Sequence, residues 1–229
     1  AYPMLPVSAS VPGGAEQALW MLEREMFQRG HATAVAACNH SQIAGKLIGT
    51  GNAPTEIDRF EPRKLEHENA VVTEIHRARE QGEPYDLVHD EGGSFWQRAR
   101  EVPVPVLATL HLPKTYYWRR AFDAVSVNVY FNCVSESQAR SFVDIPHLLG
   151  VIPNGIRATD FPGPSAERGD YVAWLGRICE EKAPHIAIQV AQEAGVPIVI
   201  AGDVYRFSYH QNYFEQEVWP RLDGSLAKR

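Results

Sequence analysis

The chain has 229 residues, of which 45% are hydrophobic and 22% are charged, and its formal net charge is -6 at pH 7. This length and composition suit a globular protein with one large or two small domains. The negative charge argues against nucleic-acid binding, which needs a basic surface. No run reaches the roughly 18 apolar residues of a membrane span. No signal peptide is visible either, so we expect a cytoplasmic protein.

The first elements expected are a helix over residues 15–29 and a strand over residues 32–37. An apolar stripe with helical spacing indicates the helix, and it is formed by Ala15, Ala18, Leu19, Leu22 and Met26. A glycine pair, Gly13 and Gly14, precedes this helix. Its backbone N–H groups could receive an anion at the helix N-terminus, although most such pairs are simply turns, and both interpretations stay open.

Residues 40–60 are polar and contain several glycines, which predicts a long loop with little regular structure. A second amphipathic helix is expected over residues 62–81, from the spacing of Leu65, Asn69, Val72, Ile75 and Arg79. A short helix over residues 136–142 is expected to have Ser135 as its N-cap. Apolar runs predict strands over residues 86–89, 104–110, 130–134 and 147–152. Such continuous apolar runs are typical of parallel strands covered by helices on both faces, which predicts an α/β fold.

Three cysteines, Cys38, Cys133 and Cys179, are spaced too widely for a disulfide framework or a zinc site. Each lies in or beside an apolar run, which predicts small buried thiols in a reducing compartment. Asp90 and Glu91 follow a strand and could bind a cation, but no Asp-x-Asp motif supports a metal site. We therefore expect no metal.

His111 directly follows the strand over residues 104–110. A histidine at the end of a central strand could bond a substrate hydroxyl or transfer a proton. The alternative is a structural histidine bonded to a loop carbonyl. A basic and aromatic patch follows over residues 114–120. It could line an acceptor site or lie against anionic lipid, and the alternative is the first turns of a partly exposed helix.

Residues 157–169 are rich in proline, glycine and charge, which marks a linker before a second domain. A βαβ unit follows, with strands over residues 171–175 and 197–201 and a helix over residues 184–194. Arg177 and Lys182 come after the first of these strands. Because ligands of open α/β sheets bind at the carboxyl ends of the strands, these cations indicate a phosphate-bearing ligand.

Beyond the βαβ unit, a helix is expected around residues 213–218, and residues 222–229 have no apolar pattern. The second sheet is therefore expected to have two strands, with exposed apolar edges.

Several segments, in their order and spacing, resemble the family 4 glycosyltransferases, which have the two-domain GT-B fold. The resemblance covers nearly the whole chain to about residue 222. Its most specific pair is VIPNGI at residues 151–156 and LGRICEEK at residues 175–182. The other segments are residues 13–16, 29–31, 109–111, 134–136 and 200–202.

Such enzymes bind a nucleotide-sugar between two Rossmann-like domains and transfer the sugar to an acceptor with retention of configuration. The resemblance implies an acceptor-side domain over residues 1–155, a linker over residues 156–169, and the first part of a nucleotide-sugar domain over residues 170–229. It implies no metal or other cofactor. The implied partners are a nucleotide-sugar donor and a sugar, lipid or small-molecule acceptor. Contact with the inner face of the membrane and self-association remain open.

The resemblance also implies roles for individual residues. His111 would lie beside the transferred sugar, and Arg177 and Lys182 would hold the donor diphosphate, so these three are the expected catalytic residues. Further donor contacts would come from Gly13, Gly14, Asn154, Gly176 and Gly202, with Gly13 and Gly14 facing the diphosphate across the cleft. The acceptor-side candidates are Tyr117, Trp118 and Arg119.

The chain departs from the family pattern in two respects. The family begins with a strand before the Gly-Gly loop, and most of it is missing here. The Glu-x7-Glu motif of the second domain is also missing, and the pairs Glu66/Glu74 and Glu83/Glu91 have its spacing in the first half only. We therefore expect the chain alone to be unstable or inactive. The alternatives left open are a truncated, non-catalytic remnant or binding module, and a nucleotide-sugar epimerase of the same fold.

Overall fold

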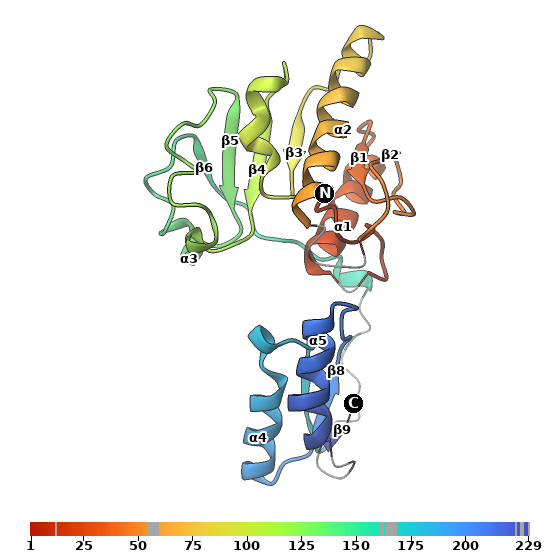
Figure 1. The fold of residues 1–229 in the computed structure, drawn as a ribbon, viewed down its shortest axis with the longest axis vertical. Coiled ribbons are helices and arrows are strands. Elements are labelled where there is room, and N and C mark those ends of the chain that lie inside the picture. Colours follow the sequence, from red (N-terminus) through yellow and green to blue (C-terminus); the bar gives the residue numbers. More distant parts are fainter. Residues whose placement is uncertain are drawn as a thin grey trace. The chain divides into compact units, whose positions relative to one another are not determined.

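The computed structural model describes residues 1–11, 13–54, 60–160, 163, 169–222 and 224, and the backbone of residues 227–228. The described residues form two compact units, one up to Arg157 and one from Ala158 onward. Each unit contains parallel strands and helices (Figure 1). No helix in the described part of the chain is both long and apolar enough to cross a membrane.

The first unit has two sheets, and all of their strands run parallel. A four-stranded sheet has the order β3-β4-β5-β6, and β1 pairs with β2 in a separate pair. The strands are β1 (Ala34–Ala37), β2 (Lys46–Gly49), β3 (Val88–Asp90), β4 (Val106–Leu110), β5 (Val129–Cys133) and β6 (Leu148–Val151). The helical elements are α1 (Gly14–Gln28), α2 (Phe60–Glu80), η2 (Phe95–Glu101), η3 (Lys114–Tyr116) and α3 (Glu136–Ala139). The prediction of parallel sheets with helices is thus confirmed.

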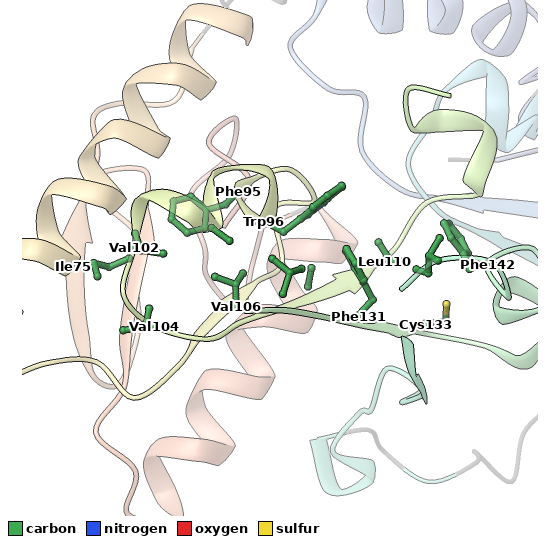
Figure 2. Packing of buried hydrophobic residues seen from close by; sticks show 14 residues of the cluster. Ile75, Phe95, Trp96, Val102, Val104, Val106, Leu110, Phe131, Cys133 and Phe142 are labelled. Atoms are coloured by element: carbon green, nitrogen blue, oxygen red, sulfur yellow. The ribbon is translucent and has the colours of Figure 1, made fainter. Parts of the chain in front are cut away.

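The core of this unit is built on β4 and β5, whose inward side chains are apolar (Figure 2). Val106, Leu110 and Phe131 are fully buried. Phe131 meets the ring of Trp96 edge-to-face, with the ring centroids 5.1 Å apart. Such aromatic contacts contribute about 0.5–1.5 kcal/mol beyond the area that they bury. The core therefore fixes the strands whose carboxyl ends carry the candidate site.

The prediction of a long loop over residues 40–60 is wrong in part, because the strand β2 lies within these residues and pairs with β1. The carboxylate of Glu23, on α1, accepts hydrogen bonds from the backbone N–H groups of Ala44 and Gly45, at 3.0 and 2.8 Å. These bonds hold the loop that leads into β2. A sequence pattern could not show this, because the strand is short and its support comes from a distant helix.

The predicted apolar stripes of the two long helices are also wrong in part. On α1 the buried residues are Glu16 and Glu23, while Leu22 and Met26 are 37% exposed. On α2 the buried set is Arg63, His67, Glu68, Ile75 and Ala78, whereas Leu65 is exposed. Hydrogen bonds offset much of the cost of burying these polar side chains. Glu68, for example, accepts a bond of 2.7 Å from Ser94.

The second unit has a three-stranded parallel sheet with the order β7-β8-β9. The expectation of two strands is wrong, because residues 227–228 add a short strand beside β8. The elements are η4 (Ala158–Asp160), β7 (Val172–Leu175), η5 (Glu180–Lys182), α4 (Pro184–Ala194), β8 (Ile198–Ala201), α5 (Ser208–Tyr213), the π-helical η6 (Phe214–Val218), η7 (Trp219–Arg221) and β9 (Ala227–Lys228). Helix α4 has the predicted bounds, with Pro184 in its first turn and Gly195 in the left-handed conformation at its end.

Candidate active site

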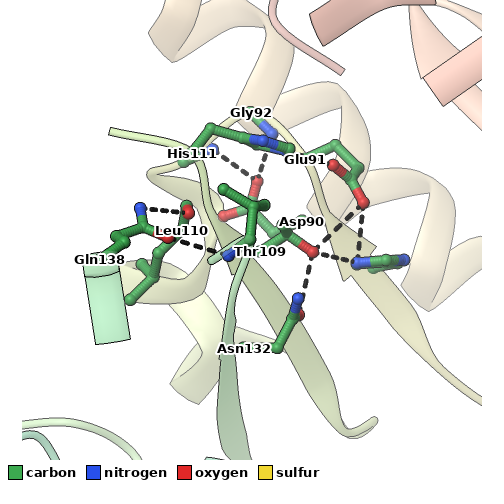
Figure 3. Close-up of polar contacts among 11 residues, drawn as sticks. Asp90, Glu91, Gly92, Thr109, Leu110, His111, Asn132 and Gln138 are labelled. Atoms are coloured by element: carbon green, nitrogen blue, oxygen red, sulfur yellow. Dashed lines mark hydrogen bonds and ion pairs between the residues drawn. The ribbon is translucent and has the colours of Figure 1, made fainter. Parts of the chain in front are cut away.

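Polar side chains from three strands meet at the carboxyl end of the four-stranded sheet (Figure 3). Thr109 on β4 donates to Asn132 on β5 at 2.9 Å and lies 3.3 Å from a carboxylate oxygen of Glu91. His89 on β3 approaches the Thr109 hydroxyl at 2.7 Å. Because parallel strands present their carboxyl ends at one edge, residues far apart in the sequence form one polar cluster there.

Glu91 is the centre of this cluster, and it bonds two histidines. His111 Nε2 lies 2.6 Å from one carboxylate oxygen, and His89 Nε2 lies 2.8 Å from the other. Glu91 is only 9% exposed. Burial alone would raise the pKa of Glu91, but the hydrogen bonds from His111 and His89 lower it well below its ordinary value. Glu91 is therefore a carboxylate throughout the neutral range.

The hydrogen-bond partner of His111 Nε2 is thus a carboxylate and not the loop carbonyl that was considered for a structural histidine. When a neutral imidazole donates its Nε2–H to Glu91, Nδ1 becomes the nitrogen that can accept a proton or a hydrogen bond. Carboxylate partners of this kind orient a histidine ring. The arrangement can therefore present a basic nitrogen at the edge of the sheet.

The loop that carries His111 is fixed by Gln138 on α3. Its side-chain amide donates to the carbonyl of Leu110 at 2.6 Å and to that of Leu112 at 3.0 Å. Its oxygen accepts from the backbone N–H of Val134 at 2.8 Å. The backbone on both sides of His111 is thereby tied to α3.

Asp90 shapes the turn after β3. Its carboxylate accepts hydrogen bonds from the backbone N–H groups of Gly92, Gly93 and Trp96, at 2.8, 3.0 and 3.0 Å. Glu91 is engaged by two histidines, and Asp90 by three backbone donors. A cation bound by both Asp90 and Glu91 would have to displace these hydrogen bonds.

A buried carboxylate lies at the predicted glycine site before α1. A side chain at Gly13 would meet Glu16 Oε2 at 1.9 Å, so the Glu16 carboxylate folds back over the start of the helix. Acidic groups are favourable at this position because of the helix dipole. Glu16 and Glu91 also line a small pocket together with Ala1, Tyr2, Ala15 and Leu19.

The predicted acceptor-side residues point in different directions. Tyr117 packs edge-to-face on Phe142, with the ring centroids 5.9 Å apart, and burial raises the pKa of Tyr117 to about 12. It therefore supports the core. Trp118 is 72% exposed, and Arg119 is exposed as well. Asn154 is exposed in the segment after β6.

In the second unit, the guanidinium of Arg177 is held by three neighbours at the carboxyl end of β7. It donates to Glu181 at 2.6 Å and to the sulfur of Cys179 at 3.3 Å, and it lies 4.9 Å from the ring centre of Tyr205. The Lys182 side chain is exposed, and its backbone N–H donates to the carbonyl of Cys179 at 3.2 Å. Ala183, between Lys182 and α4, has the left-handed conformation, which is strained for a residue other than glycine.

Gly176 and Gly202 have a packing role. A side chain at Gly202 would meet the carbonyl oxygen of Gly176 at 1.8 Å. The loops after β7 and β8 therefore run in backbone contact, and Ile178 N–H donates to the carbonyl of Asp203 at 3.0 Å. Only glycine permits so close an approach. The two glycines thus allow the loop that carries Arg177 to pack in this position. This packing role is independent of any contact that the glycines make with a ligand.

The partners of these residues are what sequence reasoning missed, namely His89, Gln138, Glu181, Tyr205 and His210. For His89 a signal was present in the sequence, because it lies in the strand β3, which pairs with β4, and His111 directly follows β4. For Tyr205 and His210 the only signal was that they follow β8, the strand that pairs with β7, and their contacts with Arg177 and Cys179 depend on folding.

A glutamine in place of Glu91 should remove a pH-dependent part of the stability. The pKa of Glu91 is lower in the folded chain than its value of about 4.3 when unfolded. Its contribution is therefore complete above that unfolded value and is lost as the pH falls toward the folded value. Urea unfolding of both proteins from pH 7 to pH 3 should show a stability gap that shrinks below about pH 4. A gap that does not change with pH would contradict this assignment.

The comparisons agree with this architecture. AviGT4, described as a glycosyltransferase involved in avilamycin A biosynthesis, has a similar crystal structure, with a TM-score of 0.59 at 17% sequence identity. The similarity covers 98% of this chain and 58% of the AviGT4 chain, so the chain spans less than two thirds of that protein. No curated protein sequence matches the chain. The fold is thus that of part of a GT-B glycosyltransferase, with Rossmann-like parallel sheets.

The family follows from the sequence match. Residues 12–160 match the family described as Glycosyltransferase Family 4. Because this match covers more than half of the chain, the chain belongs to glycosyltransferase family 4.

Proposed function

We propose that the chain is part of a retaining glycosyltransferase that moves a sugar from a nucleotide-sugar to an acceptor. The observation that carries the proposal is the Arg177 guanidinium, held at the carboxyl end of β7 by Glu181 and Tyr205, with the exposed Lys182 nearby. A fixed guanidinium offers a planar fork of donors, which suits the oxygens of a diphosphate. Retention of configuration rests on the family alone.

The chemistry explains why fixed cations matter. When the bond between the sugar and the diphosphate breaks, negative charge grows on the departing phosphate oxygens. Cations that are already in place stabilise this charge more in the transition state than in the ground state. Arg177 needs little reorganisation because Glu181 and Tyr205 hold it. These cations supply the charge that a divalent metal would otherwise supply, so we propose transfer without a metal.

In the first unit, we assign the contact with the transferred sugar or the acceptor hydroxyl to His111. Its ring is oriented by Glu91, at 2.6 Å, and its loop is tied down by Gln138. A neutral imidazole with a free acceptor nitrogen can bond a hydroxyl or receive its proton. Trp118 and Arg119 are exposed and available for an acceptor, whereas Tyr117 is half-buried and packs against the core.

The role proposed for Gly13 and Gly14 becomes weaker. The Glu16 carboxylate lies over Gly13 and would repel a diphosphate at the start of α1. We therefore place the main diphosphate contacts on Arg177 and Lys182 and not on the glycine backbone. We still propose that Asn154 contacts the donor, and the support for this contact is that the residue is exposed after β6.

Nucleotide binding tests the proposal directly. Isothermal titration calorimetry of the 229-residue chain should compare uridine, guanosine and adenosine diphosphates with the corresponding monophosphates. We expect at least one diphosphate to bind about tenfold or more tightly than its monophosphate, because the second phosphate adds charge-assisted hydrogen bonds. Equal affinities for every pair, or no binding at all, would overturn the proposal.

A further inference from the structure

Beside Arg177, three potential metal ligands converge in the second unit. They are the sulfur of Cys179, a carboxylate oxygen of Glu181 and a ring nitrogen of His210, and all three atoms lie within 4.8 Å of one another. Cys179 is the residue before η5, Glu181 belongs to η5, and His210 belongs to α5. The geometry points to a binding site for a divalent transition metal of the zinc class, which the sequence had not indicated.

His210 provides a second and independent reason to expect a ligand here. The residue is 1% exposed. Among the residues that the structure describes, neither ring nitrogen of His210 has a hydrogen-bond partner, although both are buried. The ring lies against aromatic neighbours, with the Tyr209 centroid at 4.0 Å and the Tyr205 centroid at 5.3 Å. A buried polar atom without a partner is rare and calls for a missing ion or water.

The donor set suits zinc-class ions. Thiolate, imidazole and carboxylate are the three protein ligands of Zn²⁺, with bond lengths of about 2.3, 2.0 and 2.1 Å in tetrahedral sites. These lengths require ligand atoms roughly 3.4–3.6 Å apart, a spacing below the 4.8 Å within which the three atoms lie. Cys179 and His210 are buried and fixed, whereas the Glu181 side chain is 55% exposed and can rotate inward. A water molecule or a ligand oxygen would fill the fourth position.

Arg177 competes with the metal for two of the three ligands. It donates to the Cys179 sulfur at 3.3 Å and to Glu181 at 2.6 Å. The incoming dication displaces both bonds, and the Cys179 thiol releases its proton to solvent as it becomes a thiolate. The thiolate and the carboxylate then balance the two charges of the ion. Metal binding and the present position of the Arg177 guanidinium are therefore alternatives.

This competition gives the site a signature that adventitious binding lacks. Removal of Arg177 should strengthen metal binding, because a competing cation disappears, whereas removal of a ligand should weaken it. The inference does not depend on the proposed sugar transfer, for which no metal is needed.

The test uses Co²⁺ and Zn²⁺ with the reduced 229-residue chain. We expect one equivalent of Co²⁺ to produce the charge-transfer absorption of a cobalt–thiolate bond, and Zn²⁺ to displace it. Cys179→Ser should abolish this band, and Cys133→Ser, which changes a buried cysteine of the other unit, should leave it unchanged. No thiolate band in the parent chain, or the same band in Cys179→Ser, would overturn the inference.

Two further variants test the remaining ligands. Glu181→Gln and His210→Asn should each weaken the affinity for Zn²⁺ at least about tenfold, since even the outer hydrogen-bond partners of metal ligands contribute that much. Arg177→Ala should strengthen it. Circular dichroism shows whether each variant is folded. If a variant at a buried position unfolds, the test of the metal site depends on Glu181→Gln, because that side chain is exposed. Unchanged affinity in Glu181→Gln would overturn the site.

Discussion

Arg177→Ala should weaken the binding of a nucleoside diphosphate to the chain by about 10- to 100-fold. This range corresponds to the 1.5–3 kcal/mol of a hydrogen bond to a charged group, with the larger value for a bidentate contact. Arg177 is suited to this role because Glu181 and Tyr205 already hold its guanidinium, so little conformational entropy is lost on binding. Isothermal titration calorimetry with the best-bound diphosphate measures the effect.

Two variants separate a specific contact from the loss of a positive charge. Arg29→Ala removes the same charge from a side chain that is 72% exposed in the first unit, and it should leave the affinity unchanged. Arg177→Lys keeps the charge but loses the planar fork, and it should recover only part of the affinity. Lys182→Ala should weaken binding in the same direction as Arg177→Ala. Equal effects of Arg29→Ala and Arg177→Ala would contradict the assignment.

Phe131→Ala should lower the free energy of unfolding of the first unit by about 3–5 kcal/mol, the usual cost of removing a large buried aromatic ring. Phe131 is fully buried on β5 and meets both Trp96 and Phe122 edge-to-face. Its loss would leave a cavity beneath the strand that also carries Asn132. Urea unfolding followed by tryptophan fluorescence reports this change, because Trp96 is a contact of the missing ring.

The neighbouring residue on the same strand supplies the control. Tyr130 points away from this core and is 40% exposed. Tyr130→Ala should therefore cost less than about 1 kcal/mol, as is usual for surface substitutions. If the two variants lost similar stability, the assignment of the core face of β5 would be wrong.

The local sequence pattern was sufficient to predict an element where residues close to it in the sequence stabilise it. The bounds of α4, the N-cap at Ser135 and the buried strand β4 follow from proline placement, capping and apolar runs, and the structure confirms them. The three cysteines are free and buried, as predicted. These features depend on residues within a few positions of one another, so the physical cause is visible in the sequence.

The spacing of apolar residues gave wrong predictions of the buried helix face where buried polar side chains take the place of apolar ones. Glu23 on α1 and Arg63 on α2 lie outside the predicted apolar stripes, yet both are buried because distant loops supply their partners. The strand β2 was missed for the same reason, since Glu23 supports the loop that leads into it. Burial of a charge is decided by its hydrogen-bond partners, and these are known only once the chain has folded.

The α/β class and the family resemblance could be derived from the residues alone, and the diphosphate contacts of Arg177 and Lys182 stay a prediction. The surroundings of the candidate residues became known only from the folded chain. Folding placed Glu91 between two histidines, set Glu16 over Gly13, which was expected to approach the diphosphate, and brought His210 to Cys179. Parallel strands bring residues from separate crossovers to one edge of the sheet. The chemistry of that edge therefore depends on contacts between side chains that no local pattern encodes.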